Sequence, residues 1–260
     1  MRKISFIWVM ILIWLSPFSL QAQDQPVKVW SGLLQVEGGI FFPRNSIRED
    51  IPIRQTVSHA YPGAQGHVTA TNMGLHAALK WEGYNQQRKV GFATGIRYST
   101  FITDITGSVA YNINYFYLRY GVEGADARFA RVTNISEESH FLGLPLEIRY
   151  APLEKNRVHY YIKGGIEPIY RLMHRNNIHF HNQEMNAHKE TVVEAINNPV
   201  DAFNAKIYGA FGLSLHLENG GQIAGEVLFA SSFLRNEVFS LTQSEGFSGI
   251  RLSYSIPFKK

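Results

Sequence analysis

The stretch HFLGLPLEIRYAPLEKNRVHYYIKGGIEPIYRLMH, residues 140–174, consists of two alternating segments joined by a short polar turn. In residues 142–150 every second position is apolar, and Glu147 lies on the opposite side. Residues 158–170 repeat this pattern, with Lys163 among the alternate positions. Because successive side chains of a β-strand point to opposite faces, each segment has one charge-free face and one charged face.

Similar alternation recurs along the chain after residue 30. A soluble sheet buries its apolar face, whereas a transmembrane barrel turns that face toward lipid and keeps its polar face inside. The strands that we predict outside the central hairpin are residues 30–42, 73–81, 90–99, 206–216, 223–229 and 250–258. With the two segments of the hairpin they make an all-β fold of about eight strands, which is the number that closes a small barrel.

The connections between these strands alternate in length. Long polar segments are predicted at residues 43–71, 102–138 and 173–203, with a shorter one at 235–246. Short turns are predicted at residues 82–89, 151–157 and 218–221. Outer-membrane barrels have short periplasmic turns and long extracellular loops. The sequence therefore predicts an eight-stranded antiparallel up-and-down transmembrane β-barrel with long extracellular loops and both termini in the periplasm.

The first 22 residues have the layout of a secretory signal peptide. Arg2 and Lys3 precede an apolar run over residues 4–15, and Ala22 ends a polar stretch that suits cleavage. The run is shorter than the roughly 20 residues that a membrane-spanning helix needs, although a single anchor is the alternative. We predict a cleaved signal peptide over residues 1–22 and a barrel domain over residues 23–260.

The central hairpin also carries a family resemblance. LGLPLEIRY at residues 142–150, followed after the turn by YYIKGGIEPIY at residues 160–170, resembles the porin-like, PorT-like group of outer-membrane β-barrel proteins of the Bacteroidetes type. That group reads Leu-x-x-Pro-Leu on one strand and Tyr-x-x-x-Gly on the next. The resemblance implies a bacterial outer-membrane barrel and says little about its task.

Composition excludes some classes of function. The chain has 260 residues and no cysteine, so it has no disulfide, thiolate metal site or cysteine nucleophile. The calculated pI is 9.2, but the basic residues are scattered, which does not favour a nucleic-acid partner. A mean hydropathy of −0.14 is compatible with a barrel because only alternate strand residues face lipid. Outer-membrane lipid is the expected partner, and no cofactor is expected.

Charged residues on the predicted inward faces form the largest candidate set. Their structural interpretation is a network of ion pairs that fills a small barrel, since eight strands leave room only for side chains. Their functional interpretation is a narrow solute channel. We favour the closed network, whose members are Glu37, Lys80, Arg97, Glu147, Arg149, Lys163, Glu167, Arg171, Lys206, Glu226 and Arg251.

The segment at residues 102–138 contains an aromatic cluster that is a candidate for surface recognition. Arg128 and Arg131 are an odd number of residues apart, so a strand through both would turn one toward lipid at a cost of ~2–4 kcal/mol. We therefore predict a hairpin above the membrane and keep a ten-stranded barrel as the alternative. The aromatic residues proposed for recognition are Tyr111, Tyr115, Phe116, Tyr117 and Tyr120.

Enzymatic and metal-binding alternatives have weaker support. A barrel enzyme acting on outer-membrane lipid would need a nucleophile and a base near the rim, and Ser231, Ser232, His216 and Glu226 form no evident triad. We expect Ser231 on the lipid face and Ser232 inside. His179 and His181 are weak zinc candidates in a histidine-rich loop, and we predict no metal site.

These patterns favour a non-enzymatic outer-membrane protein with a structural, surface-recognition or envelope-assembly role. A component of a secretion machine is one form of that role, and another envelope protein bound through the extracellular loops is the expected protein partner.

Overall fold

The computed structural model describes residues 31–51, 53–54, 67–85, 89–108, 114–120, 128–155, 157–196, 200–235 and 238–257. The predicted signal peptide at residues 1–22 and Tyr111 lie outside the described residues. The elements are β1 (Ser31–Ile47), β2 (Ile53–Arg54), β3 (His67–Tyr84), β4 (Val90–Ser108), β5 (Phe116–Tyr120), β6 (Arg128–Gly143), β7 (Leu146–Lys155), β8 (Val158–Phe180), the 3-10 helix η2 (Gln183–His188), α2 (Lys189–Ile196), β9 (Phe203–His216), β10 (Gln222–Phe233) and β11 (Thr242–Pro257).

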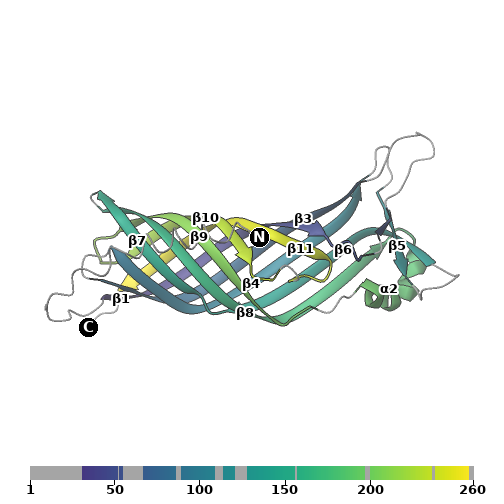
Figure 1. The fold of residues 1–260 in the computed structure, drawn as a ribbon, viewed down its shortest axis with the longest axis horizontal. Helices are drawn as coiled ribbons and strands as arrows, with labels where there is room; N and C mark the ends of the chain where they lie inside the picture. The colour runs from purple at the N-terminus through teal and green to yellow at the C-terminus, as the bar shows by residue number, and fades with distance from the viewer. Residues whose placement is uncertain are drawn as a thin grey trace, which may run out of the picture.

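The strands form one antiparallel sheet that closes on itself. Its order is β2-β5-β6-β4-β3-β1-β11-β10-β9-β8-β7, and the further pairings β6–β8 and β4–β7 join the ends. β6 and β7 occupy the same place between β4 and β8, β6 beside one half of β4 and β7 beside the other. They are two parts of one wall strand, so the ring has eight strand positions. Figure 1 shows this ring with its strands strongly inclined to the long axis.

The wall strand is interrupted at residues 144–145 for a simple chemical reason. Pro145 has no N–H to donate to a neighbouring strand. The N–H of Leu144 donates to the carbonyl of Pro168 at 3.0 Å, and regular pairing with β8 resumes when Leu146 meets Ile166. The proline therefore divides one strand into β6 and β7 without opening the ring.

The prediction of a long loop over residues 102–138 is wrong, because strands occupy much of that range. β4 continues to Ser108 and β6 begins at Arg128, so both strands extend far beyond the segments predicted for them. β5 pairs with the first part of β6, and β2 pairs with β5, outside the closed ring. The hairpin thus adds no strand position to the ring, which does not support the ten-stranded alternative.

Other strands are also longer than the sequence predicts. β8 continues to Phe180, and η2 and α2 follow it inside the predicted loop at residues 173–203. β11 begins at Thr242, inside the predicted loop at 235–246. Most outward residues of these extensions are polar, which is why the apolar alternation does not reveal them. No helix in the described part of the chain is long and apolar enough to cross a membrane.

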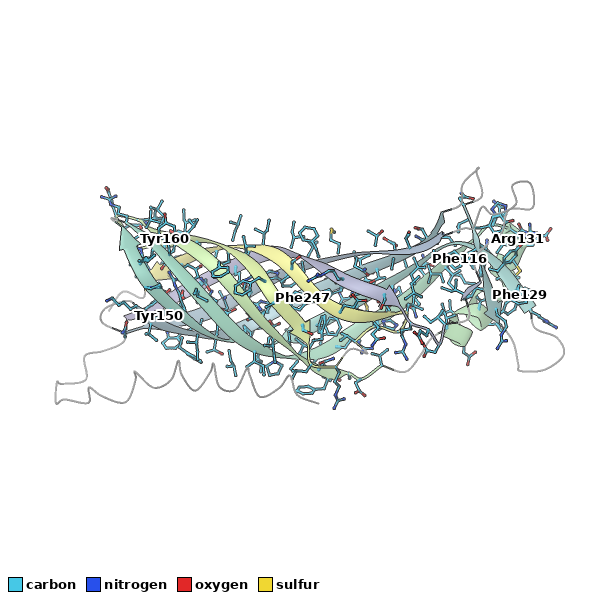
Figure 2. The ribbon with its side chains drawn as sticks, turned by 45° about the horizontal axis from the view of Figure 1, so that its top comes forward. Phe116, Phe129, Arg131, Tyr150, Tyr160 and Phe247 are labelled. Atoms are coloured by element: carbon cyan, nitrogen blue, oxygen red, sulfur yellow. The ribbon has the colours of Figure 1, made fainter. Side chains whose placement is uncertain are left out.

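The outer surface of the ring is apolar, as the alternation predicts. Val36, Leu79, Ile148, Val227 and Leu252, from five different strands, are each more than half exposed. Figure 2 shows Tyr150 and Tyr160 at one end of the ring and Phe129 and Arg131 at the other end of the molecule. The apolar side chains therefore form a band around the ring rather than a patch on one side.

Aromatic side chains form one layer inside the ring. Phe101 lies at its centre, with ring centroids 5.7–5.9 Å from those of Phe41, Phe141, Phe233 and Phe239. All five rings are at most 4% exposed. This layer closes the interior on the side away from the start of β1 and the end of β11.

A second apolar cluster lies beyond that layer, in an extension that we call the cap. The cap consists of β2, β5, α2 and the adjacent parts of β4, β6 and β8. Its fully buried centre includes Ile105, Phe116, Val132, Ile178 and Val192. Because α2 contributes Val192 to this cluster, the helix is held against the inner face of the extended strands (Figure 1).

Replacing Phe101 with alanine tests the aromatic layer. The substitution leaves a cavity among four rings, so we expect the free energy of unfolding to fall by about 3–5 kcal/mol. Phe203→Ala is the control, because Phe203 is 60% exposed on the outer surface, and it should cost less. Urea unfolding in detergent measures both, and equal losses would contradict a packed interior.

Candidate functional site

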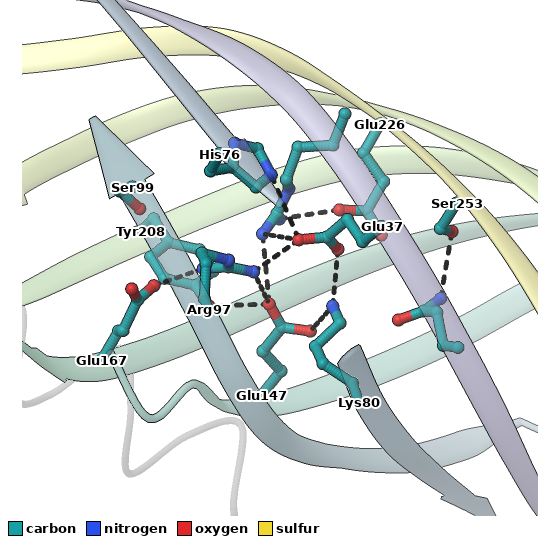
Figure 3. Close-up of polar contacts among 12 residues, drawn as sticks. Glu37, His76, Lys80, Arg97, Ser99, Glu147, Glu167, Tyr208, Glu226 and Ser253 are labelled. Carbon is teal, nitrogen blue, oxygen red and sulfur yellow. Dashed lines mark hydrogen bonds and ion pairs between the residues drawn. The ribbon is translucent and has the colours of Figure 1, made fainter. Parts of the chain in front are cut away.

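The middle of the ring is filled by charged side chains that pair across it (Figure 3). The Glu147 carboxylate on β7 lies where several cations converge. Lys80 donates to it at 2.8 Å, Arg97 at 3.0 Å and Arg251 at 3.1 Å. The hydroxyl of Tyr208 also donates to it, at 2.7 Å. These partners come from four other strands, so this one carboxylate connects opposite sides of the ring.

Glu37 on β1 is the second carboxylate of this network. Lys80 donates to one of its oxygens at 2.5 Å, and Arg97 donates to the other at 2.6 Å. His76 Nε2 lies 3.3 Å from the same carboxylate, and the His76 ring stacks on Phe41 at 4.4 Å. The charge network and the aromatic layer are therefore in direct contact through His76.

Glu167 and Glu226 complete the network on two further strands. Glu167 pairs with Arg97 and, at 2.8 Å, with Lys206. Glu226 pairs with Lys163 and, at 2.7 Å, with Arg251. Each of these side chains is at most 2% exposed. Buried charges are tolerated only when they are paired and hydrogen-bonded, and here every carboxylate has at least two cationic neighbours.

The network is compact and nearly neutral. It contains four carboxylates and five cations, namely Glu37, Glu147, Glu167 and Glu226 with Lys80, Arg97, Lys163, Lys206 and Arg251. Both arginines and all three lysines are about 1% exposed, so no water-filled path separates the charges. A selective channel needs charged groups that line open water, and these groups instead neutralise one another.

Two residues predicted for this network lie elsewhere. Arg149 forms a separate cluster toward the start of β1, where it contacts Glu82 at 3.5 Å, Tyr84, and the ring of Tyr161 at 3.6 Å. Arg171 lies beyond the aromatic layer, where its guanidinium is 5.9 Å from the Phe141 ring and donates to the carbonyl of Asp201. Both still point to the inner side of their strands.

The sequence prediction missed two buried carboxylates. The sequence pattern predicts Glu82 in a turn and Glu137 in a loop, yet both lie on strands and are at most 1% exposed. Glu82 occupies an even position in line with His76 and Lys80, so continuing the alternation by one step would have found it. No comparable signal existed for Glu137, because its strand neighbours are polar on both sides.

Glu137 holds a loop inside the mouth of the ring. Its carboxylate accepts hydrogen bonds from the backbone N–H groups of Ser240 at 2.6 Å and Leu241 at 3.1 Å. We call residues 238–241 the inward loop. Val238 and Phe239 pack into the aromatic layer, and Leu241 packs into the cap cluster, all at most 1% exposed. The inward loop therefore joins the two apolar clusters of the molecule.

The candidate catalytic residues do not form a triad. Ser231 is 6% exposed and points inward, whereas Ser232 is exposed, which reverses the prediction for both. The pairing of β10 shifts between Leu228 and Ser231, where Ala230 has a φ of 48°. This bulge adds a residue and exchanges the two faces. His216 lies instead beside His159, with ring centroids 4.2 Å apart.

The two weak metal candidates have different neighbours. His179 contacts Asn177 at 3.2 Å, and the His181 ring packs against Tyr115 at 4.8 Å. Among the described residues, no group of three His, Asp or Glu side chains is placed to hold a metal ion.

The aromatic recognition candidates divide between two faces. Phe116 is fully buried in the cap cluster and is not available for surface contact, and Tyr120 packs against that cluster with its side chain partly buried. Tyr115 and Tyr117 lie on the opposite face, partly exposed, with their ring centroids 5.7 Å apart. Arg131 on β6 lies over both, 5.4 Å and 5.9 Å from their centroids.

Sequence comparison with models of protein families gives no match, and neither does comparison with curated proteins. Among solved structures, the chain is similar to the outer membrane protein OprG from Pseudomonas aeruginosa, with a TM-score of 0.36, 11% identity, and coverage of 90% of this chain and 97% of that one. It is also similar to the outer membrane protein AlkL in DMPC lipid bilayers, with a TM-score of 0.32, 12% identity, and coverage of 92% and 98%. A third is the transport unit of the autotransporter AIDA-I from Escherichia coli, with a TM-score of 0.24, 9% identity, and coverage of 97% of each chain.

Glu147→Gln tests the ion network. Removing one partner from a buried, paired set leaves cations without compensation, so we expect the free energy of unfolding to fall by about 3–5 kcal/mol. Glu218→Gln is the matched control, because Glu218 forms an ion pair with Arg157 in which the side chains are 81% and 62% exposed. Exposed pairs contribute little, so the control should stay near the parent protein. Similar stabilities for the two variants would contradict the network.

Glu137→Gln tests the anchor of the inward loop through pH. Burial raises the pKa of Glu137, while the N–H groups of Ser240 and Leu241 and the charge of Arg171 lower it less. A raised pKa means that the carboxyl contributes most to stability below its ordinary titration range, and that this contribution is lost as pH rises through the folded-state pKa. His174 Nδ1 lies 3.5 Å from the carboxylate and also faces it.

We therefore expect the difference in unfolding free energy between the parent protein and Glu137→Gln to shift in favour of the variant between pH 4 and pH 8. Urea unfolding at a series of pH values measures this difference. A difference that stays constant with pH would show that Glu137 does not titrate with a raised pKa. Glu218→Gln again serves as the control.

Proposed function

We propose that the chain is a bacterial outer-membrane β-barrel that conducts no ions and serves surface recognition or envelope assembly through its cap. The observation that carries the proposal is the fully buried ion network in the middle of the ring. Paired charges and an aromatic layer fill the lumen, which leaves no path for ions or solutes. The cap is then the part of the molecule that is placed to meet a partner.

The apolar band supports placement in a membrane. A soluble monomer rarely exposes more than a few hundred Å² of contiguous apolar surface, yet this band continues around all the ring strands. On β8, Tyr160 and Tyr170 are both outward and exposed, ten positions apart. Ten residues of strand rise about 33 Å, which is ~25 Å along the axis of a barrel with strands tilted by ~40°. That height matches the apolar band of an outer-membrane barrel.

The charges also agree with a membrane setting. At the heights between Tyr160 and Tyr170, no outward residue in the described parts of the ring strands is Lys, Arg, Asp or Glu. Lys163 and Glu167, which lie in the same part of β8, point inward. We also propose that residues 1–22 are a signal peptide and that the chain is related to the porin-like, PorT-like group. A non-enzymatic role belongs to it as well, supported by the separation of the serine and histidine candidates.

Conductance in planar bilayers tests the closed lumen. The purified protein should insert and show no steady ion current, because the network and the inward loop fill the interior. Insertion is verified separately by resistance of the ring to protease in the same bilayers. A stable, ohmic current from the parent protein would overturn the closed-lumen proposal and favour the channel alternative.

Single cysteines test the orientation, since the natural chain has none. Thr133→Cys lies in the cap, and Asn219→Cys lies in the turn between β9 and β10 at the other end. A membrane-impermeant maleimide added to intact cells should label the first and not the second until the outer membrane is permeabilised. The reverse pattern would place the cap in the periplasm.

A further inference from the structure

The cap carries an outward face that combines aromatic and cationic side chains. This β5–β6 face consists of Tyr115, Tyr117 and Arg119 on and just before β5, and Phe129 and Arg131 on β6. The pairing places Tyr117 opposite Arg131 and Arg119 opposite Phe129. The Phe129 ring meets Tyr117 edge-on at 6.5 Å, and Arg131 lies over both tyrosines. Across the two strands Tyr117 and Phe129 thus each lie opposite a guanidinium, and along β6 Phe129 is followed on the same face by Arg131.

The face is exposed and positively charged. Phe129 is 44% exposed, and Arg119 and Arg131 are exposed. The backbone N–H of His181 donates to the carbonyl of Arg131 at 2.9 Å, which places the His181 ring beside Tyr115 at one end of the face. No carboxylate stands among the outward residues of β5 and of the part of β6 that pairs with it. The charge therefore suits an anionic ligand.

The size of the face argues against a folded protein as the ligand. The five residues from Tyr115 to Arg119 span about 13 Å, and two paired strands give an area on the order of 150 Å². A stable protein–protein interface buries about 800 Å² on each partner. The face is instead a narrow track, the width of a single extended chain.

We propose that this face binds an acidic polysaccharide. A polymer of carboxylated sugars presents C–H ring faces in alternation with carboxylates. The ring faces pack on Tyr115, Tyr117 and Phe129, and the carboxylates pair with the guanidinium groups of Arg119 and Arg131, which suit bidentate recognition of a carboxylate. The proposal rests on the proposed function, since it requires the cap to lie outside the membrane. It adds the chemical class of the ligand.

Binding of galacturonic acid oligomers to the full-length protein in detergent micelles, measured by calorimetry, tests the proposal. The oligomers should bind, and neutral dextran oligomers and polyglutamate of equal length should bind at least about tenfold more weakly. Arg131→Gln should weaken binding about tenfold, equivalent to ~1.4 kcal/mol, by removing the central guanidinium. Tyr117→Ala should weaken it to a similar extent, whereas Tyr117→Phe, which keeps the ring, should stay within about twofold.

Arg157→Gln is the matched control. It removes the same charge from an exposed arginine at the opposite end of the molecule, so binding should be unchanged. Equal loss in Arg131→Gln and Arg157→Gln would reveal general charge attraction and overturn the site. Equal binding of polyglutamate would overturn the sugar specificity. Absence of binding in a protein that inserts and conducts no ions would overturn this inference while leaving the proposed function intact.

Discussion

In the part of the chain that the structure describes, the ion network is almost fully shielded from solvent, so each of its charges must be neutralised by a residue from another strand. Glu147 illustrates the constraint, because its partners Lys80, Arg97 and Arg251 lie on β3, β4 and β11. Successive residues face opposite sides, so a slip of one residue would move a charged side chain from the network to the apolar band. In a bilayer that exposure costs ~2–4 kcal/mol for Arg or Lys at the midplane. The ion network therefore specifies strand register as well as filling the lumen.

The apolar band explains how much of the fold could be predicted from the sequence. Inside the band, strict alternation assigns the face correctly for Glu37, Lys80, Lys163 and Glu226, which meet in the structure. Beyond the band the outward residues become polar, and the alternation disappears although the strands continue. Glu137 and the cap cluster belong to that region. They were not predictable, because their burial depends on α2 and the inward loop covering them.

Local irregularities account for the remaining errors. The bulge at Ala230 exchanges the faces of Ser231 and Ser232, and nothing in the sequence around it signals a positive φ. The aromatic cluster is a different case. Phe116 lies between Tyr115 and Tyr117, so a period of two already separates a buried ring from two surface rings. The sequence therefore contains the signal that divides the predicted recognition group into buried and surface rings.

The pairing of β1 with β11 has a consequence for how the molecule is made. Glu37 belongs to the first strand and Arg251 to the last, and the register places Gly39 opposite Arg251. Until the C-terminal strand arrives, Glu37 and Glu226 lack one of their cations, and an open, half-formed sheet must keep those carboxylates hydrated. Closure expels that water and completes the charge pairing in the same event. Closure of the ring and completion of the charge pairing therefore depend on the same strand, and a chain that lacks β11 would leave Glu37, Glu147 and Glu226 without Arg251.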